Sequence, residues 1–159
     1  MKIKIFTTGG SIDKAYSTQE SRLVVAGPQV ANILDEANVT IEWEVQSILK
    51  KDSLELTDGD REMIVEQVRQ DPHRHIILTH GTDTMIETAQ ALSSITGKVI
   101  VLTGSMQPAA FQRSDAAFNV GGAIIAVQTL PEGIYLVMNG QVFDPDRASK
   151  NLVQNRFES

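Results

Sequence analysis

One stretch decides the fold of this 159-residue chain: His75-Ile76-Ile77-Leu78-Thr79-His80-Gly81-Thr82-Asp83-Thr84-Met85. Its first half is an apolar run typical of a buried strand, and its second half is a turn that places hydroxyl groups beside glycine. The amino terminus repeats this arrangement, because Ile3-Lys4-Ile5-Phe6 is followed by Thr7-Thr8-Gly9-Gly10-Ser11-Ile12-Asp13. Ligands bind outside the carboxyl ends of the strands in an open parallel sheet. The two turns therefore predict one shared site.

Strand and helix signals alternate along the rest of the chain. Pro28 and Thr57 are placed to begin two helices, and Asp60 stands three residues after Thr57 as part of a capping box. The remaining elements expected from the pattern are strands at residues 40–45, 99–102 and 134–138 and helices at residues 84–94 and 115–130. This order predicts an α/β fold with three layers, a doubly wound and mostly parallel sheet of about five central strands.

Two segments carry weaker signals. Residues 9–22 form a polar segment with no regular pattern, and residues 139–159 are expected to hold at most one short strand, near residues 141–143. Met63, Ile64 and Val68 are expected to form the apolar stripe of the helix after Thr57.

Composition excludes several classes of function. Hydrophobic residues make up 42% of the chain and charged residues 21%, which fits one soluble domain over residues 1–159. The net charge of −6 argues against nucleic acid as a partner, and the absence of cysteine excludes disulfides and thiolate metal sites. The amino terminus lacks the apolar core of a signal peptide, and no apolar run approaches the ~20 residues that span a bilayer. We expect a cytoplasmic protein without a metal, a cofactor or a membrane partner.

Each hydroxyl-rich turn has an ordinary interpretation beside a catalytic one. Thr8 precedes two glycines at a strand end, where a plain tight turn is one explanation and an activated nucleophile is another. A phosphate loop is disfavoured, because the third glycine and the lysine of such loops are missing. Thr82 and Asp83 suit a helix cap, but the free N–H groups of a helix start also suit an oxyanion. His80 is interpreted as a packed, hydrogen-bonded histidine rather than a general base.

Thr8-Gly9-Gly10-Ser11-Ile12 and His80-Gly81-Thr82-Asp83-Thr84-Met85 resemble the two signature motifs of bacterial-type L-asparaginases. The likeness continues through residues 102–108, 113–119 and 146–150, so it covers essentially the whole chain. It implies the flavodoxin-like amino-terminal domain of that family. It also implies roles for individual residues. Thr8 resembles the primary nucleophile, and Tyr16 the lid tyrosine that positions it.

The other implied roles belong to residues that little else in the sequence would single out. Thr82, Asp83 and Lys150 resemble a second triad of hydroxyl, acid and lysine. Ser53 and Asp83 would bind the α-carboxylate and α-ammonium of the substrate, and the backbone at Ser105 would contact its side-chain amide. Taken alone, Ser53 lies in an ordinary turn and Lys150 would be a solvated charge.

The chain also departs from the family pattern. Ser11 replaces the usual threonine, and Tyr16 lies only eight residues after Thr8, so the lid is short. Family members are usually about twice as long, with a second domain that closes the site of a neighbouring subunit and supplies an acidic residue. The resemblance therefore implies the amino-terminal catalytic domain without the second domain, and a homo-oligomer that covers the open wall.

Two hypotheses about function follow. The first is an L-asparagine amidohydrolase, which releases L-aspartate and ammonia through a threonine nucleophile and an acyl-enzyme, with at most minor glutaminase activity. The alternative is an amino-acid-binding or regulatory module with weak or no catalysis. Retention of Thr8 and Lys150 favours the enzyme, because a sensor needs only the residues that bind the amino acid. A flavodoxin-like cofactor binder is disfavoured by an aromatic content of 5%.

Overall fold

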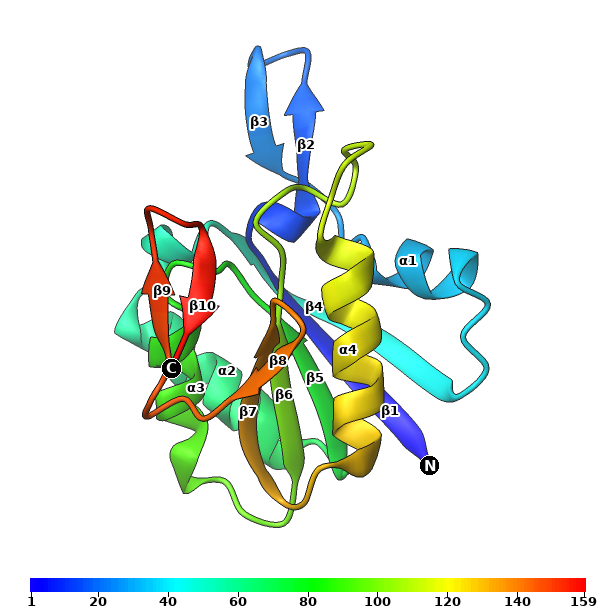
Figure 1. Cartoon of the computed structure of the whole chain (residues 1–159), viewed down its shortest axis with the longest axis vertical. Coiled ribbons are helices and arrows are strands. Elements are labelled where there is room, and N and C mark those ends of the chain that lie inside the picture. Colours follow the sequence, from blue (N-terminus) through cyan, green and yellow to red (C-terminus); the bar gives the residue numbers. More distant parts are fainter.

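The computed structural model describes all 159 residues and contains one six-stranded sheet with helices on both faces (Figure 1). The strands of this sheet are β1 (Lys2–Gly9), β4 (Glu42–Lys51), β5 (His75–Thr79), β6 (Val99–Thr103), β7 (Gly133–Met138) and β8 (Gln141–Phe143). They lie in the order β4-β1-β5-β6-β7-β8, and all neighbours pair in parallel except β7 and β8. The predicted parallel sheet is therefore confirmed, with one antiparallel strand added at its edge.

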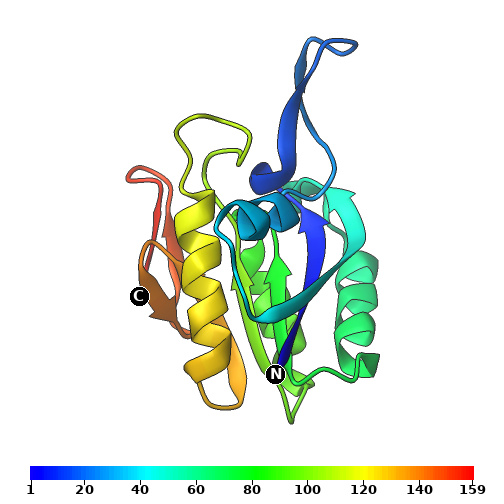
Figure 2. The same ribbon diagram turned by 90° about the vertical axis from the view of Figure 1, so that its right-hand side faces the viewer.

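The helices form the two outer layers of the predicted three-layer fold (Figure 2). They are α1 (Val30–Glu36), α2 (Asp58–Gln70), α3 (Met85–Ala91) and α4 (Ala116–Thr129), together with the short 3₁₀ turns η1 (Ser11–Asp13), η2 (Ser53–Glu55) and η3 (Leu92–Ser94). α1 and α4 cover one face of the sheet, and α2 and α3 cover the other.

Each face of the sheet has its own apolar core, because alternate residues of a strand point to opposite sides. In β5, Ile77 packs with α1 and α4, while Ile76 and Leu78 pack with α2 and α3. All three side chains are fully buried, which explains why this strand is an uninterrupted apolar run.

The strand order predicts where a ligand would bind. When the five parallel strands are numbered along the chain, their order in the sheet is 2-1-3-4-5, which is the flavodoxin-like order. After β1 the chain builds one side of the sheet with β4 and then crosses to the other side with β5. Ligands bind at the carboxyl ends of the strands at such a switch point. Here that point lies between the ends of β1 and β5.

The capping box that the sequence predicts at the start of α2 is present. Thr57 Oγ1 accepts a hydrogen bond from the Asp60 amide at 3.1 Å, and Asp60 Oδ2 accepts one from the Thr57 amide at 2.9 Å. Ile64 and Val68 are fully buried, as expected, but Met63 is 38% exposed. Met63 lies one residue outside the stripe that faces the sheet, so its assignment to the core was wrong.

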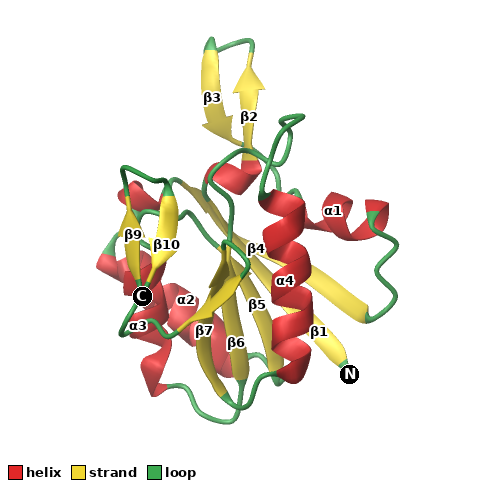
Figure 3. Ribbon diagram, in the orientation of Figure 1, coloured by secondary structure: helices red, strands yellow, loops and turns green.

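Two hairpins were not predicted (Figure 3). β2 (Lys14–Ser17) and β3 (Arg22–Val25) form an antiparallel hairpin that projects beyond the sheet, and β2 lies in the segment expected to be irregular. β9 (Ser149–Asn151) pairs with β10 (Arg156–Glu158), so the expectation of at most one strand after residue 139 was wrong. The second hairpin is anchored by Phe157, which is buried beside Phe143, and these contacts far apart in sequence leave no local pattern.

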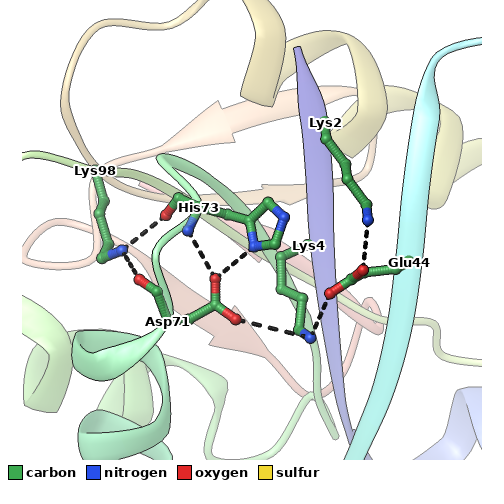
Figure 4. Close-up of polar contacts among 6 residues, drawn as sticks. All are labelled: Lys2, Lys4, Glu44, Asp71, His73 and Lys98. Carbon is green, nitrogen blue, oxygen red and sulfur yellow. Dashed lines mark hydrogen bonds and ion pairs between the residues drawn. The ribbon is translucent and has the colours of Figure 1, made fainter.

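A network of charged groups lies near the amino ends of the strands, away from the crevice (Figure 4). Lys4 on β1 is only 7% exposed, and its Nζ lies 2.7 Å from Glu44 and 3.7 Å from Asp71. The Asp71 carboxylate also accepts hydrogen bonds from the backbone and ring nitrogens of His73. None of the helices combines the length and the apolar character that crossing a bilayer requires.

Candidate active site

Thr8 and Thr79 meet across the switch point. Thr8 is almost completely buried at the carboxyl end of β1, and its Oγ1 donates a hydrogen bond to the backbone carbonyl of Thr79, at the end of β5, at 2.8 Å. The neighbouring Thr7 is also buried, but its hydroxyl has no hydrogen-bond partner. Because side chains alternate along a strand, the two adjacent threonines have different environments, and only the Thr8 hydroxyl forms a hydrogen bond to the end of β5.

Glycine allows the two turns to touch. Gly10 has φ 86° and ψ −175°, a conformation that is essentially restricted to glycine. A Cβ atom on Gly10 would overlap the backbone of Gly81, so the turn after β1 lies directly against the turn after β5. A Cβ atom on Gly81 would in turn come within 2.6 Å of the Ser53 side chain. Three loops therefore converge at this point without side chains to separate them.

Lys150 connects the tail of the chain to the turn after β5. Its Nζ donates hydrogen bonds to Thr82 Oγ1 at 2.8 Å and to Asp83 Oδ1 at 2.7 Å. Lys150 lies on β9, and the hairpin of β9 and β10 places it beside Asp83, which is 67 residues earlier in the chain. Thr82 is buried, whereas Asp83 is partly exposed and its Oδ2 makes no hydrogen bond. The arrangement holds a positive charge against a hydroxyl and leaves one carboxylate oxygen available.

Ser53 is buried in η2 and faces the same turn. Its Oγ accepts a hydrogen bond from the Thr84 amide at 3.3 Å, and its carbonyl accepts one from Thr84 Oγ1 at 2.8 Å. Asp52 next to it caps η2 and forms an ion pair with Lys14 at 2.8 Å. The hydrogen bond from Lys14 lowers the pKa of Asp52 below its usual value.

Ser105 lies in the loop after β6, on the other side of the turn after β5. It is buried, and its Oγ donates a hydrogen bond to the Gln107 carbonyl at 2.5 Å. Gly104 packs so closely on His80 that a Cβ atom there would overlap the His80 carbonyl oxygen. The loop therefore borders the same crevice.

Tyr16 is placed differently from the other predicted site residues. It lies on β2, in the hairpin that projects beyond the sheet (Figure 1). Its side chain is 64% exposed, and no hydrogen bond joins it to Thr8. The structure thus brings the other predicted site residues to one edge of the sheet and leaves Tyr16 outside them. The residues brought together are Thr8, Ser53, Thr82, Asp83, Ser105 and Lys150.

His80 is a packed, hydrogen-bonded histidine, as the sequence predicts. It is fully buried, and burial lowers its pKa to about 4. The Gly81 carbonyl can only accept, so Nδ1 donates to it at 2.7 Å, and Nε2 then accepts from the Thr88 hydroxyl at 2.7 Å. Both ring nitrogens are occupied, so His80 has no free nitrogen with which to act as a general base.

Sequence reasoning missed two acidic residues near the crevice. Asp13 is buried in η1, where burial raises its pKa to about 6, although the Gln29 amide donates a hydrogen bond to it at 2.9 Å. Asp115 binds backbone amides of the loop that contains Ser105. Its place directly before α4 suggested a cap. No group of three or more His, Asp or Glu side chains is arranged to hold a metal ion.

Comparison with known proteins decides the family. The family model described as asparaginase, N-terminal, matches residues 2–158. The chain belongs to the asparaginase family. It is 32% identical to the L-asparaginase of Thermococcus kodakarensis over 100% of this chain and 51% of that protein. It is 29% identical to the glutaminase-asparaginase of Acinetobacter glutaminasificans over 94% of this chain and 50% of that protein.

Solved structures of asparaginases share this fold. The thermostable L-asparaginase of Thermococcus kodakarensis superposes with a TM-score of 0.86 at 30% identity, over 100% of this chain and 51% of that one. L-asparaginase I of Vibrio cholerae gives a TM-score of 0.84 at 28% identity, over 99% of this chain and 51% of that one. This chain therefore spans about half the length of the relatives that it matches.

Proposed function

We propose that this chain hydrolyses the side-chain amide of L-asparagine to L-aspartate and ammonia, with Thr8 as the nucleophile. One observation carries the proposal. The buried Thr8 hydroxyl and the network of Thr82, Asp83 and Lys150 converge at the switch point of an asparaginase fold. Enzymes that act through a hydroxyl need such a nucleophile beside groups that handle protons and charge. Residues 1–159 would act as one catalytic domain.

The reaction would proceed in two steps. Thr8 Oγ1 attacks the amide carbon, and the hydroxyl proton passes to the leaving nitrogen. The bond between carbon and nitrogen then breaks, which releases ammonia and leaves an ester between Thr8 and the aspartyl group. Water then cleaves this ester, which restores the Thr8 hydroxyl and releases aspartate. The Thr8 hydroxyl now donates to the Thr79 carbonyl, so it must rotate away from that carbonyl to react. No cofactor takes part in either step.

The second network would stabilise charge and bind substrate. The Lys150 ammonium occupies a lone pair of Thr82 Oγ1, so the Thr82 hydroxyl points its proton elsewhere and can donate it to the developing oxyanion. Asp83 Oδ2 is available for the substrate's α-ammonium group, while Ser53 would meet the α-carboxylate. Tyr16 would reach Thr8 only if the hairpin of β2 and β3 closed over the crevice.

We also propose a preference for asparagine over glutamine and a homo-oligomeric state. One methylene group discriminates by only ~1–3 kcal/mol, so some glutaminase activity is compatible with the proposal. The exposed side chains of Phe118 and Ile125 on α4 and Val142 on β8 line one groove that contains no charged residue, and such a surface suits an interface. Sedimentation that shows a fully active monomer would contradict the oligomer.

The proposed reaction is tested with two adjacent, isosteric variants. Thr8→Val should abolish ammonia release from asparagine, while Thr7→Val should retain it, because the Thr7 hydroxyl has no partner. Both threonines are buried on the same strand, so each variant replaces a core hydroxyl with a methyl group, and melting curves measure the cost of the bond to Thr79 that only Thr8→Val loses. Full turnover by Thr8→Val would refute the mechanism. Tight binding of asparagine by the wild-type chain without ammonia release would favour the alternative, a binding module.

A further inference from the structure

The first turn of α4 holds the loop after β6. The Asp115 carboxylate accepts hydrogen bonds from the Met106 amide at 2.9 Å and from the Gln107 amide at 3.0 Å. Asp115 is the N-cap residue of α4, yet its side chain makes no capping bond. Ser114 Oγ accepts from the Ala116 amide instead, at 3.1 Å. An aspartate at this position ordinarily satisfies its own helix. Here it is committed to a loop eight or nine residues earlier.

Asn119, one turn further along α4, adds a second attachment to the loop; the contacts of Asp115 and Asn119 with residues 104–107 are here called the clamp. Its Nδ2 donates to the Gly104 carbonyl and to Asp115 Oδ2, both at 3.0 Å. The hydroxyl of Ser114 donates to the Gln107 carbonyl at 3.0 Å, in addition to the bond from Ser105. The backbone of residues 104–107 is therefore tied to α4 at both of its ends.

The clamped loop borders both signature turns. Gly104 packs directly on the His80 carbonyl, and the Ala109 amide donates to the Ile12 carbonyl at 3.1 Å. α4 itself is fixed by the core, because Ala116, Val120 and Ala123 are buried against the sheet. The position of the loop relative to Thr8 is thus set by a rigid element through Asp115 and Asn119.

We propose that Asp115, with Asn119, is a positioning residue that fixes the backbone of Ser105 for the side-chain amide of the substrate. The inference rests on the proposed asparaginase function. It depends on the chemistry of the carboxylate, which accepts three N–H donors with two oxygens. A carboxamide at position 115 would turn an NH₂ group toward the NH₂ of Asn119 or toward the loop amides. Neither orientation satisfies the clamp.

The test uses Asp115→Asn, Asn119→Asp and the double swap. In Asp115→Asn we expect kcat for asparagine to fall by ~10–100-fold, because misplacement by about 1 Å costs up to that much. KM should change far less, since Asp83 would still bind the α-ammonium group and Ser53 the α-carboxylate. In the double swap the bond between residues 115 and 119 is restored with reversed polarity, but the Gly104 carbonyl has no donor. Asn119 is buried, so a carboxylate at position 119 would face that carbonyl without a donor between them, and neither Tm nor kcat should recover to its wild-type value.

Gln128→Ala is the matched control, because it removes a side-chain hydrogen bond of 2.7 Å from the far end of the same helix. It should leave kcat unchanged. Unchanged kcat in Asp115→Asn, or recovery of kcat together with Tm in the double swap, would overturn the inference.

A wild-type chain that releases no ammonia would refute the proposed function separately. In that case the positioning role of Asp115 is tested by calorimetry, which measures the binding of asparagine and of aspartate. Asp115→Asn should weaken binding of asparagine more than binding of aspartate, because only asparagine carries the amide. Equal weakening, or binding of neither amino acid by the wild type, would overturn the inference as well.

Discussion

Gly10→Ala tests the contact between the two signature turns. The φ of 86° and ψ of −175° cost a non-glycine residue about 1–3 kcal/mol. The added Cβ would also overlap the Gly81 backbone, and forcing atoms into packed space costs about 1–3 kcal/mol more. Gly10→Ala should therefore lower the free energy of unfolding by about 2–6 kcal/mol, a large part of the 5–15 kcal/mol that ordinarily stabilises a domain. The folded fraction should also lose turnover, because the two turns must separate.

Two other glycines separate these contributions. Gly97 has φ 78°, but a Cβ atom there meets nothing within 4 Å, so Gly97→Ala should show the backbone strain alone. Gly27 has neither strain nor a close neighbour, and Gly27→Ala should be neutral or stabilising by up to ~1 kcal/mol. Urea unfolding gives the free energy of unfolding for each variant. If Gly10→Ala and Gly97→Ala lost the same amount, the close approach of the turns would be refuted.

Two further predictions concern charge. Lys150→Met should lower kcat by about 100-fold or more, because a charged donor near the reacting groups is lost. Its partner Asp83 is exposed, so the loss of stability should be limited to ~1 kcal/mol. Steady-state kinetics and melting curves measure the two effects, and unchanged turnover would contradict the role of Lys150. Asp13 has a folded pKa of about 6 against 3.8, so the stability that it contributes is full below about pH 4 and is lost as the pH rises through 6. Asp13→Asn should therefore flatten the stability profile between pH 4 and 7 and stabilise the protein at pH 7 by at most about 3 kcal/mol; an unchanged profile would contradict the burial of this charge.

The main elements and part of the site could be predicted because their signals are local. β5 has the predicted bounds because an apolar run ends at a polar turn, and the meeting of Thr8 with the turn after β5 follows from the geometry of parallel strands. The hairpins could not be predicted, because β9 and β10 are short, polar and held by contacts such as Phe157 with Phe143.

Other parts of the site depend on contacts that sequence patterns do not contain. Lys150 lies 68 residues from Thr82 along the chain, and only the resemblance to a family singled it out. Asp115 has the residue type and position of a helix cap, so its commitment to the Met106 and Gln107 amides emerges only from the structure.

The strand beside the one that bears the nucleophile candidate carries an optical probe near its amino end. Trp43, the only tryptophan of the chain, lies on β4, packs against the core under α1, and pairs in register with Ile3. Thr8 is five residues further along β1, a distance of roughly 17 Å at about 3.3 Å per residue. Tryptophan emission therefore reports the integrity of the sheet and not the state of the crevice. The folded fraction of any site variant can be read in the same cuvette as its turnover.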